Sequence, residues 1–255
     1  MFSNRGQQST GHLSFRSGNP ALSASTFKSV HGSRDLKLMT IDGTVNRTII
    51  SLFILLLSGA FTYIFELMAL TFIGLIVGMI LAIATMFKPQ WSPKTVPLYA
   101  LFQGMALGGI SFMFNTMYEG IVTQAIVLTA GIFFSLLLAY KSRLIKATEN
   151  FKLGVTAATG GIFMLYMVSM LMSLFGAGRM PIMDPTNSSL FSIGFSVVVV
   201  VIASLNLVLD FDFIEEASEA GVPQYMEWRA TLGLLITLVW LYLEILRLLA
   251  KLRSR

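Results

Sequence analysis

Residues 188–251 read SSLFSIGFSVVVVVIASLNLVLDFDFIEEASEAGVPQYMEWRATLGLLITLVWLYLEILRLLAK, and this stretch decides the fold. It opens with 22 residues without a charge, Ser188 to Leu209. After a turn that contains Gly221 and Pro223, a second apolar run extends from Arg229 to Leu249. Because about 20 apolar residues cross the hydrocarbon core of a bilayer, the stretch predicts two membrane helices joined by a turn.

Carboxylates gather around that turn. Seven of the thirteen acidic residues of the chain lie in this part of the sequence: Asp210, Asp212, Glu215, Glu216, Glu219, Glu227 and Glu244. Ionisable side chains beside or inside membrane helices are rare and usually functional. The acidic turn is therefore the first place to look for ion chemistry.

The composition predicts a membrane protein throughout. Hydrophobic residues make up 55% of the chain, charged residues only 12%, and the mean hydropathy is +0.75, whereas soluble domains carry about 25% charged residues. The chain has no cysteine, which excludes disulfides and thiolate metal sites. We interpret the net charge of +5 as basic loops near anionic lipid and expect no nucleic-acid partner.

The rest of the chain predicts five more membrane helices. Residues 1–46 are polar and predict a disordered cytoplasmic tail, which contains both histidines, His12 and His31. The forty residues from Thr48 to Phe87 contain one charge, Glu66. Since forty helical residues would measure about 60 Å, twice a bilayer core, we expect a hairpin that turns near Glu66. Further spans are expected at 95–114, 121–140 and 155–175, which gives an all-α domain of seven transmembrane helices over 47–255.

Two groups of small residues predict close helix packing. Gly74 and Gly78 lie four residues apart in the second predicted helix, and Gly104, Gly108 and Gly109 lie on one face of the third. Small residues let membrane helices approach closely.

The distribution of Lys and Arg predicts the orientation. With seven spans, thirteen of the eighteen basic residues fall on the side of the N-terminal tail and five on the other. The first side includes a basic loop in which we place Lys141, Arg143, Lys146 and Lys152. Cytoplasmic loops carry the excess of Lys and Arg, so the N-terminus and the acidic turn are expected in the cytoplasm. A six-span arrangement with a re-entrant last segment is the alternative, because the C-terminus is also basic.

The motifs of several enzyme classes are absent from the sequence. It contains no His-Glu zinc motif and no Gly-Lys-Ser/Thr phosphate loop. No histidine is available in the membrane part to activate a serine. We therefore predict that the protein is not an enzyme and has no cofactor.

The remaining candidate chemistry is ion or proton binding by the carboxylates. On a helix, Asn206 and Asp210 stack four residues apart, while Asp212, Glu215, Glu216 and Glu219 share the opposite face. Crowded carboxylates suit proton sensing or binding of a hard cation through oxygen. A solvated helix end is the alternative for Glu215, Glu216 and Glu219. For Glu244, Arg247 three residues on predicts an interfacial ion pair.

Six segments resemble the bacterial branch of the Bax inhibitor family, also called the transmembrane Bax inhibitor motif family. They are Asn19-Pro-Ala-Leu22, Met39-Thr-Ile-Asp-Gly-Thr-Val-Asn-Arg47, Pro97-Leu-Tyr-Ala-Leu-Phe-Gln-Gly104, Leu107-Gly-Gly-Ile-Ser111, Leu209-Asp-Phe-Asp-Phe-Ile-Glu-Glu216 and 237–249. The resemblance covers essentially residues 19–252. It implies a seven-helix fold with the last helix central, in the inner (plasma) membrane, and a pH-sensitive calcium leak. It also implies restraint of cell death in eukaryotes and modulation of a membrane protease in bacteria.

The resemblance also implies a pair of aspartates, of which only one is present. Asp210 matches the first, whereas the second falls on Thr237. Asp212 and Glu227 are the candidates to replace it. Two hypotheses follow: a proton-gated cation leak that uses Asp210 and Asp212, or a non-conducting regulator that binds other membrane proteins. The expected ion- or proton-sensing residues are Asn206, Asp210, Asp212, Glu215 and Glu227.

Overall fold

The computed structural model describes residues 37–255 except 177 and 179, so most of the predicted tail, with His12 and His31, lies outside the described residues. The described chain folds into seven long helices. These are α2 (Ile41–Ile64), α3 (Met68–Phe87), α4 (Ser92–Met117), α5 (Ile121–Lys141), α6 (Glu149–Leu174), α7 (Leu190–Glu219) and α8 (Met226–Arg253), with short 3₁₀ turns η2 (Pro89–Trp91) and η3 (Pro181–Met183). All seven helices are long and apolar enough to cross a membrane.

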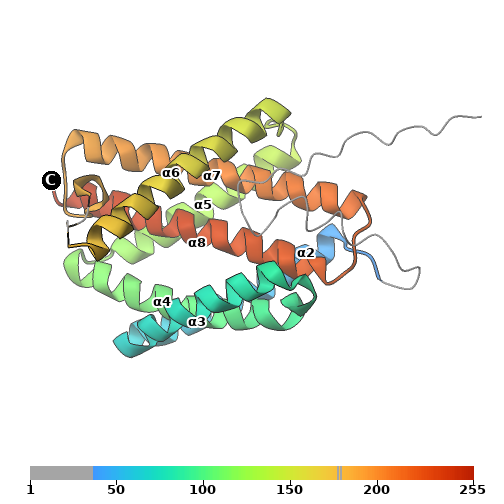
Figure 1. Ribbon diagram of the computed structural model, residues 1–255, viewed down its shortest axis with the longest axis horizontal. Helices are drawn as coiled ribbons and strands as arrows, with labels where there is room; N and C mark the ends of the chain where they lie inside the picture. The colour runs from blue at the N-terminus through green and yellow to red at the C-terminus, as the bar shows by residue number, and fades with distance from the viewer. Residues whose placement is uncertain (1–36, 177, 179) are drawn as a thin grey trace, which may run out of the picture.

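Helix α8 lies at the centre of the bundle (Figure 1). It packs against α2, α4, α5 and α7. Nineteen of its 28 residues are buried, whereas α5 buries two of 21. The predicted all-α architecture with a central last helix is confirmed. A re-entrant last segment is excluded, because α8 runs without a break from Met226 to Arg253.

The first two helices form the predicted hairpin. α2 ends at Ile64 and α3 begins at Met68, and Glu66 between them has a left-handed backbone with φ 55°. The amide of Leu67 donates to the Thr62 carbonyl at 3.2 Å. This six-residue hydrogen bond is typical of a helix end in which one left-handed residue reverses the chain.

The first helix begins before the predicted domain boundary at residue 47. Helix α2 starts at Ile41, so residues 41–46 are helical and are not part of a disordered tail. The cause is local, because the Thr40 side chain accepts a 3.0 Å hydrogen bond from the Gly43 amide and so caps the first turn.

The glycines of α4 and α3 contact neighbouring backbones, as predicted. A Cβ atom at Gly104 would collide with the Leu55 carbonyl oxygen of α2, and one at Gly109 with the Thr71 side chain of α3. A Cβ atom at Gly74 of α3 would likewise collide with the Phe102 carbonyl oxygen of α4. The three helices therefore pack at distances that only glycine allows.

Seven spans place the two ends of the membrane domain on opposite faces (Figure 1). Thirteen basic residues lie on the face of the N-terminal tail and five on the face of the C-terminus, so the N-terminal face is expected in the cytoplasm. We therefore expect a reporter fused after Arg255 to be active outside the cytoplasm. Paired fusions of alkaline phosphatase, which is active outside, and green fluorescent protein, which fluoresces inside, would test this. A C-terminal fusion that is active only in the cytoplasm would contradict the orientation.

Candidate functional site

The candidate residues of α7 lie on two faces of a single continuous helix. Asn206 and Asp210 are buried, with exposed fractions of 2% and 0%. The Asn206 amide donates to the Thr159 hydroxyl of α6 at 2.7 Å and to the Ile202 carbonyl at 2.9 Å. Asn206 therefore joins α7 to α6.

Asp210 is a fully buried carboxylate near the end of a membrane helix. Its neighbours along the helix, Leu207, Phe213 and Ile214, are buried as well. Charged or titratable side chains enter this end of the bundle from every adjoining helix: Arg47 of α2, Tyr140 of α5, Lys152 of α6, and Glu227 and Arg229 of α8. Arg229 donates to the carbonyls of Thr85 and Met86 at 2.7 and 3.1 Å and so ties α8 to the end of α3.

The opposite face of α7 carries a compact polar group that we call the Lys152 cluster, formed by Tyr140, Lys152, Asp212, Glu215 and Glu216. Lys152 Nζ lies 2.5 Å from Asp212 Oδ2 and 2.6 Å from Glu216 Oε1. The Tyr140 hydroxyl donates to Glu215 Oε2 at 2.5 Å and lies 3.3 Å from Asp212 Oδ1. The cluster therefore links α5, α6 and α7, and its carboxylates are hydrogen-bonded instead of freely solvated.

Glu227, at the start of α8, holds a second group that we call the clasp. Its carboxylate forms an ion pair with Arg47 of α2 and has no exposed surface. Glu227 Oε1 also accepts from the amide and the hydroxyl of Thr40, at 2.9 and 3.1 Å. Arg47 lies over the Trp228 ring, 5.3 Å from its centroid.

Backbone pairing extends the clasp across the turn between α7 and α8. The Met39 amide donates to the Val222 carbonyl and the Gln224 amide to the Lys37 carbonyl, both at 2.8 Å. Met39 is 2% exposed and packs on Phe213. The segment before α2 therefore covers the acidic end of α7.

The residues considered as a second member of the aspartate pair have contacts of their own. Asp212 is paired with Lys152, and Glu227 with Arg47. Thr237 is buried, and its hydroxyl donates to the Gly233 carbonyl four residues back at 3.3 Å. Each of these groups has a partner of its own.

Glu244 forms the predicted ion pair with Arg247, at 3.0 Å. It also accepts a hydrogen bond from the Tyr166 hydroxyl of α6. At 2% exposure Glu244 is buried, so the pair joins α6 and α8 inside the bundle and does not lie at a solvated interface.

Three partners of the acidic residues were missed in the sequence: Arg47, Tyr140 and Lys152. The assignment of Lys152 to a loop was wrong, because Thr148 caps α6 and places Lys152 inside its first turn, 3% exposed. The sequence did contain one signal: with seven spans, the basic loop assigned to Lys152 and the acidic turn lie on the same side of the membrane. Within the part of the chain that the structure describes, no three His, Cys, Asp or Glu side chains form a metal-binding group.

Comparison with known proteins identifies the family. The family model described as Bax inhibitor 1 like matches residues 19–254. No curated protein and no solved structure matches the chain. Since the match covers nearly the whole chain, including all seven helices, the protein belongs to the Bax inhibitor 1 like family.

Proposed function

We propose that this protein is a pH-sensitive calcium leak in which Asp210 is the proton-sensing group. The observation that carries the proposal is the fully buried Asp210 carboxylate in a membrane helix. Burial disfavours the ionised form of a carboxylate, and an ionisable residue at such a place marks an ion or proton pathway more often than a structural role. The resemblance to calcium-leak members of the family supports the same assignment.

The charges around Asp210 indicate how protonation would act. The Lys152 cluster and the clasp balance carboxylates with Lys152 and Arg47, and they hold α2, α5 and α6 against the ends of α7 and α8. Loss of the Asp210 charge alters the field in which these ion pairs sit, in surroundings where screening by water is weak. The end of the bundle that holds the Lys152 cluster and the clasp then shifts between two arrangements. One of them offers carboxylate oxygens to a passing Ca²⁺, which prefers oxygen ligands.

The direct test is calcium flux in proteoliposomes between pH 6 and 8, a range centred near neutral pH. Wild-type protein is expected to give flux that depends on pH. Asp210→Asn imitates the protonated carboxyl in shape and charge, so its flux is expected to be nearly constant over this range. A calcium-sensitive dye trapped in the vesicles would measure the rate.

Two controls separate proton sensing from a general loss of charge. Glu219→Gln removes a charge from the exposed end of the same helix, and Glu244→Gln removes one from the distant Arg247 pair; both should keep the pH response of the wild type. An Asp210→Asn curve that overlays wild type would refute the sensor. Wild-type vesicles that show no flux above empty ones would refute the leak.

The second candidate function is a non-conducting regulator that binds other membrane proteins. Thr237 favours it, because a neutral side chain stands where the resemblance implies the second aspartate and its hydroxyl bonds to its own helix. Absence of flux, together with recovery of one defined membrane protein after cross-linking in cells, would support the regulator.

A further inference from the structure

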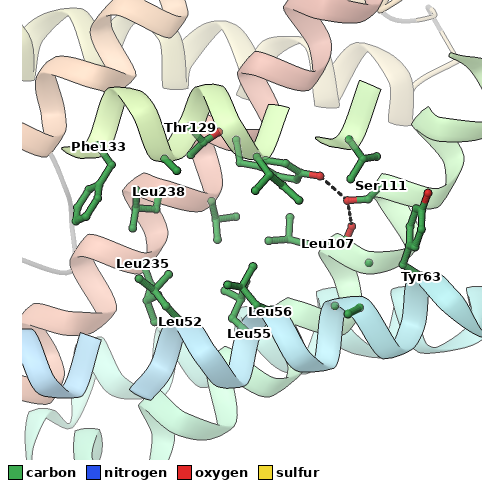
Figure 2. Close-up of a pocket in the computed structure, with 18 of the residues that line it drawn as sticks. Leu52, Leu55, Leu56, Tyr63, Leu107, Ser111, Thr129, Phe133, Leu235 and Leu238 are labelled. Carbon is green, nitrogen blue, oxygen red and sulfur yellow. Dashed lines mark hydrogen bonds between the residues drawn. The ribbon is translucent and has the colours of Figure 1, made fainter. Parts of the chain in front are cut away.

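A cavity of about 610 Å³ lies between α2, α4, α5 and α8 and shares no lining residue with the site around Asp210. Figure 2 shows side chains of these helices enclosing it. Its floor is buried and includes Leu107, Leu235 and Val239, whereas its rim includes Leu56 of α2 and Phe134 of α5, which are 54% and 59% exposed. The volume falls within the range of about 300–1,000 Å³ that is typical of small-molecule sites.

The cavity runs along the bundle and opens sideways. Its lining residues on α2 extend from Leu52, at mid-helix, to Tyr63, one residue before the end of the helix. At 1.5 Å per residue this is about 16 Å, roughly half a bilayer core. The rim lies on helices that face outward in the spanning region, so the opening faces the lipid and not the water.

Polarity changes along the cavity. All twenty lining residues are uncharged. In Figure 2 Leu52, Phe133 and Leu235 lie at one end, and the hydroxyl-bearing Tyr63 and Ser111 lie at the other. Thr129 lies beside Phe133, but its hydroxyl donates to the Ala125 carbonyl of its own helix at 2.7 Å. An elongated site that is apolar at mid-membrane and polar towards the helix ends fits an amphiphile with its tail directed inward.

The hydrogen bonds at the polar end define the head that would fit. The Ser111 hydroxyl donates to the Leu107 carbonyl at 2.6 Å and lies 2.6 Å from the Tyr242 hydroxyl. Since Ser111 has a single hydroxyl hydrogen, Tyr242 donates to Ser111 and keeps an oxygen lone pair for an incoming donor. A hydroxyl group supplies such a donor, whereas a charged head would be buried without a counter-charge at high cost.

We propose that this cavity binds a neutral lipid with one acyl chain and a hydroxyl-bearing head. The chain lies between α2 and α5 against the floor formed by α4 and α8, and the head hydroxyl donates to Tyr242. The proposal is independent of calcium transport, because no carboxylate lines the cavity.

Binding of 1-monooleoylglycerol to purified full-length protein in detergent would test the proposal, measured by native mass spectrometry and by thermal stabilisation. Wild type is expected to retain one lipid and to be stabilised. Ala130→Phe on α5 and Ala60→Phe on α2 place a ring in the cavity and are expected to abolish both effects. Val127→Phe is the matched control, because Val127 is 64% exposed and lies outside the lining.

The head contact has its own test. Tyr242→Phe removes the hydroxyl and is expected to raise the dissociation constant about three- to tenfold. This ratio corresponds to the net free energy of one hydrogen bond. Oleate and a two-chain phosphatidylcholine should bind more weakly than the neutral probe. Unchanged binding of 1-monooleoylglycerol by both cavity-filling variants would overturn the site. Binding of phosphatidylcholine as tight as that of the neutral probe would also overturn it, as would mass spectra that show a bound protein partner and no bound lipid.

Discussion

Gly108→Leu is expected to prevent stable packing of the first three helices. A Cβ atom at Gly108 would collide with the Gly59 carbonyl oxygen and lie 2.9 Å from Thr62 Cβ, both on α2. Backbone atoms cannot move aside as the end of a flexible side chain can, so α2 and α4 must separate. We expect a loss of about 3 kcal/mol or more, at or above the upper end of the usual cost of overpacking.

Thermal unfolding in detergent and the yield of monodisperse protein would measure this effect. Gly131→Leu is the matched control, because Gly131 lies in α5 and, apart from its chain neighbours and the nearby backbone of its own helix, none of the described residues would lie within 4 Å of a Cβ atom there. The control should behave like wild type. Equal stability of the two variants would contradict the role of Gly108 in helix packing.

Lys152→Met is the second change with a large expected effect. Its ammonium group is the shared partner of Asp212 and Glu216, and the lysine side chain is 4% exposed. The variant leaves two carboxylates close together without a cation. Removal of one member of a buried ion pair costs about 3–5 kcal/mol, and we expect the lower end because Asp212 and Glu216 keep 18% and 22% of their side-chain surface exposed.

A neutralised background separates loss of charge from loss of packing. Lys152→Met combined with Asp212→Asn and Glu216→Gln should recover much of the lost stability, since no uncompensated charge remains. Lys146→Met changes an exposed lysine of the same basic region and should have little effect. A triple variant as unstable as the single one would show that the aliphatic part of Lys152 matters more than its charge.

The helices could be predicted because each is a long apolar run, and polar or charged residues separate one run from the next. Leu190–Glu219 and Met226–Arg253 contain the two apolar runs on either side of the acidic turn, and Glu66 marks the hairpin because no other charge interrupts residues 48–87. The role of the glycines in packing was likewise readable, because small residues at helical spacing have few other uses in a membrane.

The partners of the acids were harder to predict. Arg47 meets Glu227 and Lys152 meets Asp212 through contacts between segments far apart in the chain. A single sequence gives no distance between such segments, and Lys152 was counted with a loop because its helix begins with the polar residues 149–150. The buried Glu244 shows the opposite case, since its partner Arg247 lies only three residues away.

The clasp has a consequence for biosynthesis. Arg47 and Glu227 are 180 residues apart in the chain, so Arg47 enters the membrane long before its carboxylate partner leaves the ribosome. Lys152 likewise precedes Glu216 by 64 residues. A nascent chain that stalls before the last helix therefore contains Arg47 without its carboxylate partner, and one that stalls before α7 lacks the partners of Lys152 as well.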